Sequence, residues 1–97
     1  MANTRPDITI LPNVDNDVYA LLNAQAGEPA VTVGAKLRIQ NKSDQAVYIH
    51  QTDQVVTDFT GGTRLPVNWQ SVTDDGILGC KATTTTTAKR LQVEVLS

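Results

Sequence analysis

The stretch that decides the fold runs over residues 36–51, Lys-Leu-Arg-Ile-Gln-Asn-Lys-Ser-Asp-Gln-Ala-Val-Tyr-Ile-His-Gln. Apolar and polar side chains alternate at its start, so a strand there places Leu37 and Ile39 on one face. Residues 41–44 have the composition of a loop, and a second alternating run follows over 46–51. We therefore expect a β-hairpin with a loop of about four or five residues.

Comparable short runs rich in β-branched residues recur along the chain, because Val, Ile and Thr make up 29 of the 97 residues. The expected strands cover residues 7–11, 36–40, 46–51, 54–59, 64–69, 76–82 and 90–96. Turn residues, Gly61-Gly62 and Asp74-Asp75-Gly76, separate the later runs. Pro66 limits the run over 64–69 to an edge strand or a loop lying over the core. This pattern predicts an all-β fold of about seven or eight short strands, a small antiparallel β-sandwich that is jelly-roll-like or barrel-like.

Two segments fit more than one structure. Residues 15–26 could form a helix capped by Asp15 and ended by Gly27, with Val18, Leu21 and Leu22 facing inwards. A strand over 18–22 is the alternative that we favour, because the segments after it are β. The threonines at 83–87 are expected to be extended and polar, as an exposed edge strand or a loop.

Length and charge limit the function further. A chain of 97 residues and 10.5 kDa is expected to be one domain over 1–97, with residues 1–6 as a candidate N-terminal arm. The net charge of −2 argues against nucleic acid as a partner. We find no secretory signal and no apolar run approaching the ~20 residues that span a bilayer, so we expect a soluble chain made in the cytoplasm, without a membrane partner.

The residues that carry chemistry are too few to build an active site. His50 is the one histidine and Cys80 the one cysteine, and nothing in the sequence places them together or beside a third group. Zinc needs three or four ligands, and the calcium-loop pattern is missing. We therefore expect no enzyme, no metal and no cofactor, with Cys80 as a small buried apolar residue.

A resemblance adds to this interpretation. The stretch Val-Gly-Ala-Lys-Leu-Arg-Ile-Gln-Asn-Lys-Ser over 33–43, followed by Ala-Val-Tyr-Ile over 46–49, resembles small β-structured accessory proteins of tailed-bacteriophage virions. In these proteins a glycine introduces a strand ending in Gln-Asn, and a short polar loop leads to a second strand. The tryptophan that they more commonly carry near the end is absent from residues 76–80.

The resemblance implies a structural virion protein: a head-decoration (cement) protein that stabilises the capsid, or a component of the neck or tail. Its partners would be the major capsid protein or other virion proteins, and it would form a homo-oligomer, with a trimer favoured. We expect protein contacts at Tyr48 and His50, which share the face opposite Val47 and Ile49, and at Trp69 and Arg5. The alternative is a non-catalytic ligand-binding module, for example for a host-surface glycan, that uses Trp69, Tyr48 and His50.

Overall fold

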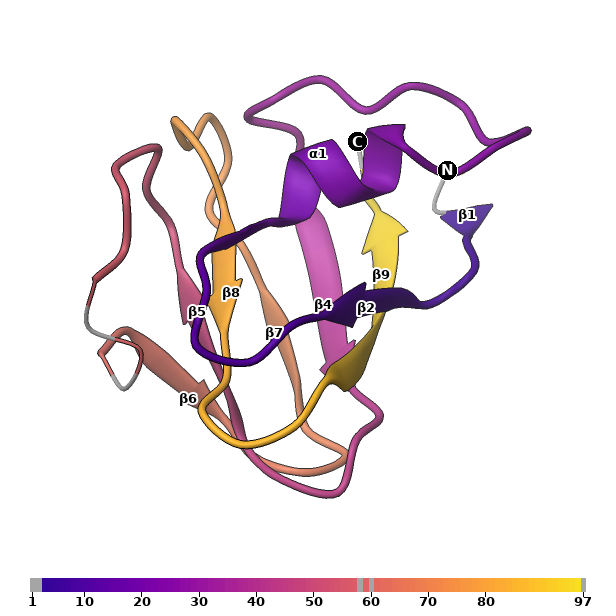
Figure 1. Cartoon of the computed structure of the whole chain (residues 1–97). Helices are drawn as coiled ribbons and strands as arrows, with labels where there is room; N and C mark the ends of the chain where they lie inside the picture. Colours follow the sequence, from indigo (N-terminus) through magenta and orange to yellow (C-terminus); the bar gives the residue numbers. More distant parts are fainter. Residues whose placement is uncertain (1–2, 58, 60, 97) are drawn as a thin grey trace.

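The protein folds into two packed antiparallel sheets with one short helix (Figure 1). The computed structural model describes residues 3–57, 59 and 61–96. In chain order its elements are β1 (Asn3–Thr4), β2 (Ile8–Ile10), β3 (Asn16–Asp17), α1 (Val18–Asn23), β4 (Leu37–Asn41), β5 (Val47–His50), β6 (Thr63–Leu65), β7 (Gln70–Val72), β8 (Lys81–Thr83) and β9 (Lys89–Val95). The all-β sandwich expected from the sequence is thereby confirmed.

The strand order is that of a jelly roll. One sheet, here called sheet A, has the order β2-β9-β4-β7, with β1 pairing a further part of β9. The other, sheet B, has the order β3-β8-β5-β6. Numbering β2 to β9 as strands one to eight gives sheets 1-8-3-6 and 2-7-4-5, the two interlocked Greek keys of the jelly roll.

The prediction of a β-hairpin over residues 36–51 is wrong. β4 pairs with β9 and β7 in sheet A, whereas β5 pairs with β8 and β6 in sheet B. Residues 42–46 therefore cross from one sheet to the other. Alternation could not separate the two arrangements, because a strand buries the same side chains whether its neighbour in sequence pairs with it or faces it across the core.

The two sheets bury the side chains that alternation assigned to the core. Leu37 and Ile39 of sheet A, and Val47 and Ile49 of sheet B, are at most 4% exposed. The final strand is also confirmed, since Leu91 and Val93 are buried between polar neighbours. One cluster of buried residues joins both sheets to the helix.

The strand favoured over 18–22 is a helix instead. Asp17, not Asp15, is its N-cap, and the Asp17 carboxylate accepts a hydrogen bond from the Ala20 backbone N–H at 3.2 Å. Val18 and Leu22 lie four residues apart and both are buried, so the helix covers one end of the core with a single face. Gly27 does have positive φ, but it lies beyond the C-cap, Ala24.

Three further expectations are corrected. Among the described residues of 54–59 there is no strand, and Phe59 instead accepts a hydrogen bond from the Thr83 hydroxyl of β8 through its backbone carbonyl. The run expected over 76–82 becomes a strand only at Lys81. Of the five threonines, Thr83 and Thr84 are buried, so only 85–87 are exposed as expected.

The N-terminal segment is not a free arm in the residues that the structure describes. Asn3 and Thr4 pair with Val95 and Glu94 of β9, and residues 1–2 lie outside the described part. Arg5, expected to contact a partner, is 4% exposed and faces inwards. Its guanidinium donates hydrogen bonds to the backbone carbonyls of Leu22 and Pro29, both at 2.8 Å, which ties the segment to the end of α1 and the loop after it.

Candidate protein-contact site

Four loops that join the two sheets gather at one end of the sandwich. These loops, here together called the crossover end, are residues 11–15, 42–46, 66–69 and 84–88. Figure 1 shows the chain ends and α1 at the opposite end of the molecule. Because each loop leaves one sheet and enters the other, its position is fixed at both of its ends by strand pairing.

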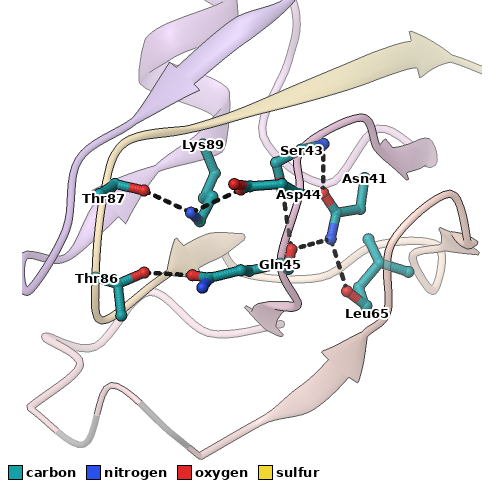
Figure 2. A network of polar contacts seen from close by, with 8 residues as sticks. All are labelled: Asn41, Ser43, Asp44, Gln45, Leu65, Thr86, Thr87 and Lys89. Carbon is teal, nitrogen blue, oxygen red and sulfur yellow. Dashed lines mark hydrogen bonds and ion pairs between the residues drawn. The ribbon is translucent and has the colours of Figure 1, made fainter.

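Through its side chain, Asn41 ties the loop 42–46 to the end of β6, next to the loop 66–69 (Figure 2). Its side chain is fully buried, and its amide donates hydrogen bonds to the carbonyls of Gln45 at 2.8 Å and Leu65 at 2.9 Å. The Asn41 side-chain oxygen accepts a hydrogen bond from the Ser43 backbone N–H at 2.9 Å and another from the Ser43 hydroxyl. The side chain is thus fully used inside the protein, which leaves it inaccessible to modification or to a partner.

A buried lysine links the loop 42–46 to the loop 84–88. The Lys89 side chain is only 1% exposed, and its ammonium lies 3.1 Å from a carboxylate oxygen of Asp44, whose own side chain is 85% exposed. The same ammonium donates a hydrogen bond to the Thr87 hydroxyl at 2.6 Å. Thr86 donates a further bond to the Gln45 side chain (Figure 2). The hydrogen bond from Lys89 lowers the pKa of the Asp44 carboxyl below its ordinary value of 3.8.

This pair predicts an acid dependence of stability. Because the folded-state pKa of Asp44 lies below 3.8, its contribution is complete above that pH and is lost as the pH falls through the folded-state value. Asp44→Asn should therefore destabilise the protein at neutral pH, and the difference from the wild type should shrink on acidification below 3.8. Urea unfolding of both proteins over this pH range measures the difference. A difference that stays constant with pH would show that the ion pair contributes nothing.

The loop 11–15 is held by Asn16, the first residue of β3. The Asn16 side-chain nitrogen lies within hydrogen-bond distance of the carbonyls of Leu11 at 3.0 Å, Val14 at 3.1 Å and Ala82 at 3.0 Å, which share its two N–H groups. Its oxygen accepts one from the Leu11 backbone N–H at 3.0 Å. Asn13 adopts positive φ and donates through its backbone to the Thr84 carbonyl, so this loop is also joined to the loop 84–88. Leu11 and Val14 remain 55% and 43% exposed.

The loop 66–69 presents the one tryptophan. The Trp69 backbone N–H bonds the Pro66 carbonyl at 3.0 Å across a turn in which Asn68 has φ of 65°, a conformation that asparagine tolerates. Asn68 and Trp69 both bond the backbone of Asn41, which makes a β-bulge at the start of β7. The Trp69 side chain is 65% exposed and the neighbouring Val67 38%. A turn and a bulge thus fix the backbone of an exposed indole.

The structure separates the residues that the sequence proposed as contacts. Trp69 lies at the crossover end with its side chain exposed. Tyr48 and His50 lie on the outer face of sheet B, opposite Val47 and Ile49 as expected, but both are half-buried. His50 is 3.1 Å from the Thr83 hydroxyl and lies against Gly62. With Arg5 buried elsewhere, Trp69 is the most accessible of the four.

Other reactive groups do not converge in the described residues. Cys80 is buried as expected, and burial raises the pKa of its thiol to about 12. In residues 3–57, 59 and 61–96 no group of three or more His, Cys, Asp or Glu side chains could hold a metal ion, and no pocket opens in their surface. The described part also contains no helix of the length and apolar character needed to span a membrane.

Comparisons with known proteins add no relative. No protein-family model, no curated protein and no solved structure matches the chain. The interpretation of the site therefore rests on its own geometry.

Proposed function

We propose that this chain is a structural protein that acts by protein–protein contacts at its crossover end, as a component of a tailed-bacteriophage virion. The observation that carries the proposal is the exposed Trp69 on a turn whose backbone is fixed by hydrogen bonds to Asn41. Tryptophan is enriched among the residues that dominate protein interfaces, and a prearranged backbone reduces the ordering cost of binding.

The composition of the crossover end also supports a protein partner. Residues 85–88 are Thr-Thr-Thr-Ala and are exposed, and Lys89 next to them is paired with Asp44. Lys42 is paired with Asp7, at 3.1 Å. Such a surface requires few charges to be desolvated on binding, because most of its exposed groups are hydroxyls, amides and apolar side chains. The jelly roll itself does not carry the proposal, since the same fold serves capsid, lectin and enzyme domains.

Within a virion, we propose a head-decoration protein that stabilises the capsid, or a neck or tail component. Deleting the protein from particles should lower their resistance to heat or to chelation if it acts as a cement. Quantitative gel densitometry distinguishes the positions, since decoration implies many copies per particle and a neck or tail role implies few. Particles of unchanged resistance that contain many copies would contradict the stabilising role.

A glycan-binding module is the second candidate, supported by the amide side chains of Asn68 and Gln70 on either side of the exposed Trp69. Tyr48 and His50 lie on a different surface, so the three-residue site expected from the sequence is not one cluster in the structure. A glycan array at high protein concentration tests this candidate, and the absence of binding would exclude it for the glycans displayed.

Trp69 is the one tryptophan of the chain and thus reports directly on this surface. We expect the emission of a water-exposed indole and efficient quenching by acrylamide in the free protein, because Trp69 is 65% exposed. Binding of a partner at the crossover end should shift the emission to shorter wavelength and reduce quenching. Emission typical of a buried indole in the free, dilute protein would contradict the structure of this turn.

A further inference from the structure

In the part of the chain that the structure describes, the sandwich has four open sheet edges, and three of them carry features that hinder pairing with another chain. Edges are commonly protected by charge, by proline or by short length. β6 contains Arg64 and is followed by Pro66, β3 is two residues long and contains Asp17, and Pro6 and Asp7 interrupt the β1–β2 edge. The fourth edge is β7, Gln-Ser-Val over 70–72, which has neither charge nor proline.

Backbone groups on the β7 edge face outwards without a partner. Thr73 donates to the Leu37 carbonyl at 2.8 Å, and Asn41 donates to the Trp69 carbonyl at 3.0 Å. In an antiparallel ladder the hydrogen-bonded pairs alternate, so Ser71 bonds Ile39 while Gln70 and Val72 point their N–H and C=O groups away from β4.

The open stretch has defined limits. The next outward N–H, that of Asp74, is already bound by the Gln51 side chain at 2.7 Å. At the other end, the Trp69 N–H is taken by the turn. Two N–H and two C=O groups are thus left without a partner among the described residues, flanked by Val72, which is 47% exposed, and by the exposed Trp69.

We infer that β7 is an interface between copies of this chain, in which β7 of a second copy pairs antiparallel to it about a twofold axis at Ser71. This register places Gln70 opposite Val72 of the second copy, and Val72 opposite its Gln70. Each outward N–H of one copy then meets an outward C=O of the other, so the partial charges complement one another by symmetry. This gives four hydrogen bonds between the copies and a single sheet that continues from sheet A of one molecule into sheet A of the other.

Formal charges are compatible with this partner. The strand itself carries none, and the same register places Asp74 and Asp75 opposite Asn68 and Val67 of the second copy rather than opposite like charges. The exposed Val72 and Trp69 lie beside the seam, so pairing removes apolar surface from water. An arbitrary extended peptide would not share this symmetry, which is why a second copy is the occupant that we infer.

The purified chain tests the inference without reference to its function. Light scattering or sedimentation over about a hundredfold range of concentration should show a monomer–dimer equilibrium. Val72→Pro removes an N–H that faces away from β4, so the internal ladder is kept and two inter-chain bonds are lost by symmetry; we expect the dimer Kd to rise about tenfold or more. Val72→Thr keeps both the N–H and the β-branched shape and is the matched control, which should still dimerise.

Amide resonances test the same interface if Val72→Pro does not fold. In the wild type the N–H groups of Gln70 and Val72 should gain protection from hydrogen exchange as concentration rises, whereas that of Ser71 should be protected throughout. A chain that stays monomeric, a dimer unaffected in folded Val72→Pro, or Gln70 and Val72 amides that never gain protection would overturn the inference. The trimer favoured by the sequence would also overturn the inference. In a threefold ring each subunit joins one surface to a different surface of its neighbour, whereas the inferred interface joins β7 to β7.

Discussion

Arg5→Ala should lower the free energy of unfolding by about 3 kcal/mol, one of the two largest losses that we expect from a single polar substitution in this protein. The Arg5 side chain is 4% exposed and donates to the Leu22 and Pro29 carbonyls and, at 2.9 Å, to the Gln25 side chain. Removing it leaves these acceptors without a charged donor and opens a gap beside α1. Urea unfolding followed by circular dichroism measures the change.

Arg38 provides the matched control. It lies on the outer face of sheet A, paired with Glu94, and its side chain is 40% exposed. Arg38→Ala should therefore cost no more than about 1 kcal/mol. Arg5→Lys should fall between the two, because an ammonium keeps the charge but lacks the planar fork that reaches three acceptors. Equal losses for Arg5→Ala and Arg38→Ala would show that the buried guanidinium does not hold α1 and its following loop.

Asn41→Ala should cost a similar amount, about 3 kcal/mol, and should act at the crossover end. The substitution leaves the Leu65 carbonyl and the Ser43 N–H without their side-chain partner, and it removes one of the two side-chain donors to the Gln45 carbonyl. Because Leu65 ends β6 whereas Ser43 and Gln45 lie in the loop 42–46, the loss loosens the connection between this loop and β6. Thermal or urea unfolding measures the total effect.

Gln40→Ala is the control for this residue, since Gln40 neighbours Asn41 in sequence but lies on the outer face of β4 and is half-buried. We expect its effect to stay within about 0.5 kcal/mol. Acrylamide quenching of Trp69 adds a local measurement, because the Asn41 side chain bonds the Leu65 carbonyl just before the turn that presents Trp69. An Asn41→Ala protein as stable as Gln40→Ala would contradict the network in Figure 2.

The sequence predicted which side chains are buried better than it predicted which strands are neighbours. Alternation correctly assigned Leu37, Ile39, Val47 and Ile49 to the core, because that assignment depends only on each strand having one inner face. The pairing of β4 with β9 joins residues fifty or more positions apart, and no local pattern encodes it. The helix was missed for a different reason: six residues are too short for the periods of helix and strand to differ clearly.

The candidate site was predictable only in part. Trp69 stood out as the one tryptophan, in a stretch interrupted by proline, and it is exposed. Arg5 was proposed as a contact because of its place near the N-terminus, but it finds three acceptors inside the protein. The pairing of Lys89 with Asp44 was not foreseen, since the two residues are 45 positions apart. Long-range polar contacts of this kind depend on the topology, which the sequence pattern left open.

In the function that we propose, the crossover end attaches this protein to a virion through Trp69. The most direct measurement compares the copy number per particle of the wild type, Trp69→Ala and Leu78→Ala by quantitative gel densitometry. Leu78 is 74% exposed and lies away from the crossover end, in the segment between β7 and β8, so it controls for the loss of an exposed apolar side chain. We predict that the wild type and Leu78→Ala are retained equally and that folded Trp69→Ala is lost. Particles that lack the wild-type chain, or that retain Trp69→Ala at the wild-type level, would contradict the claim.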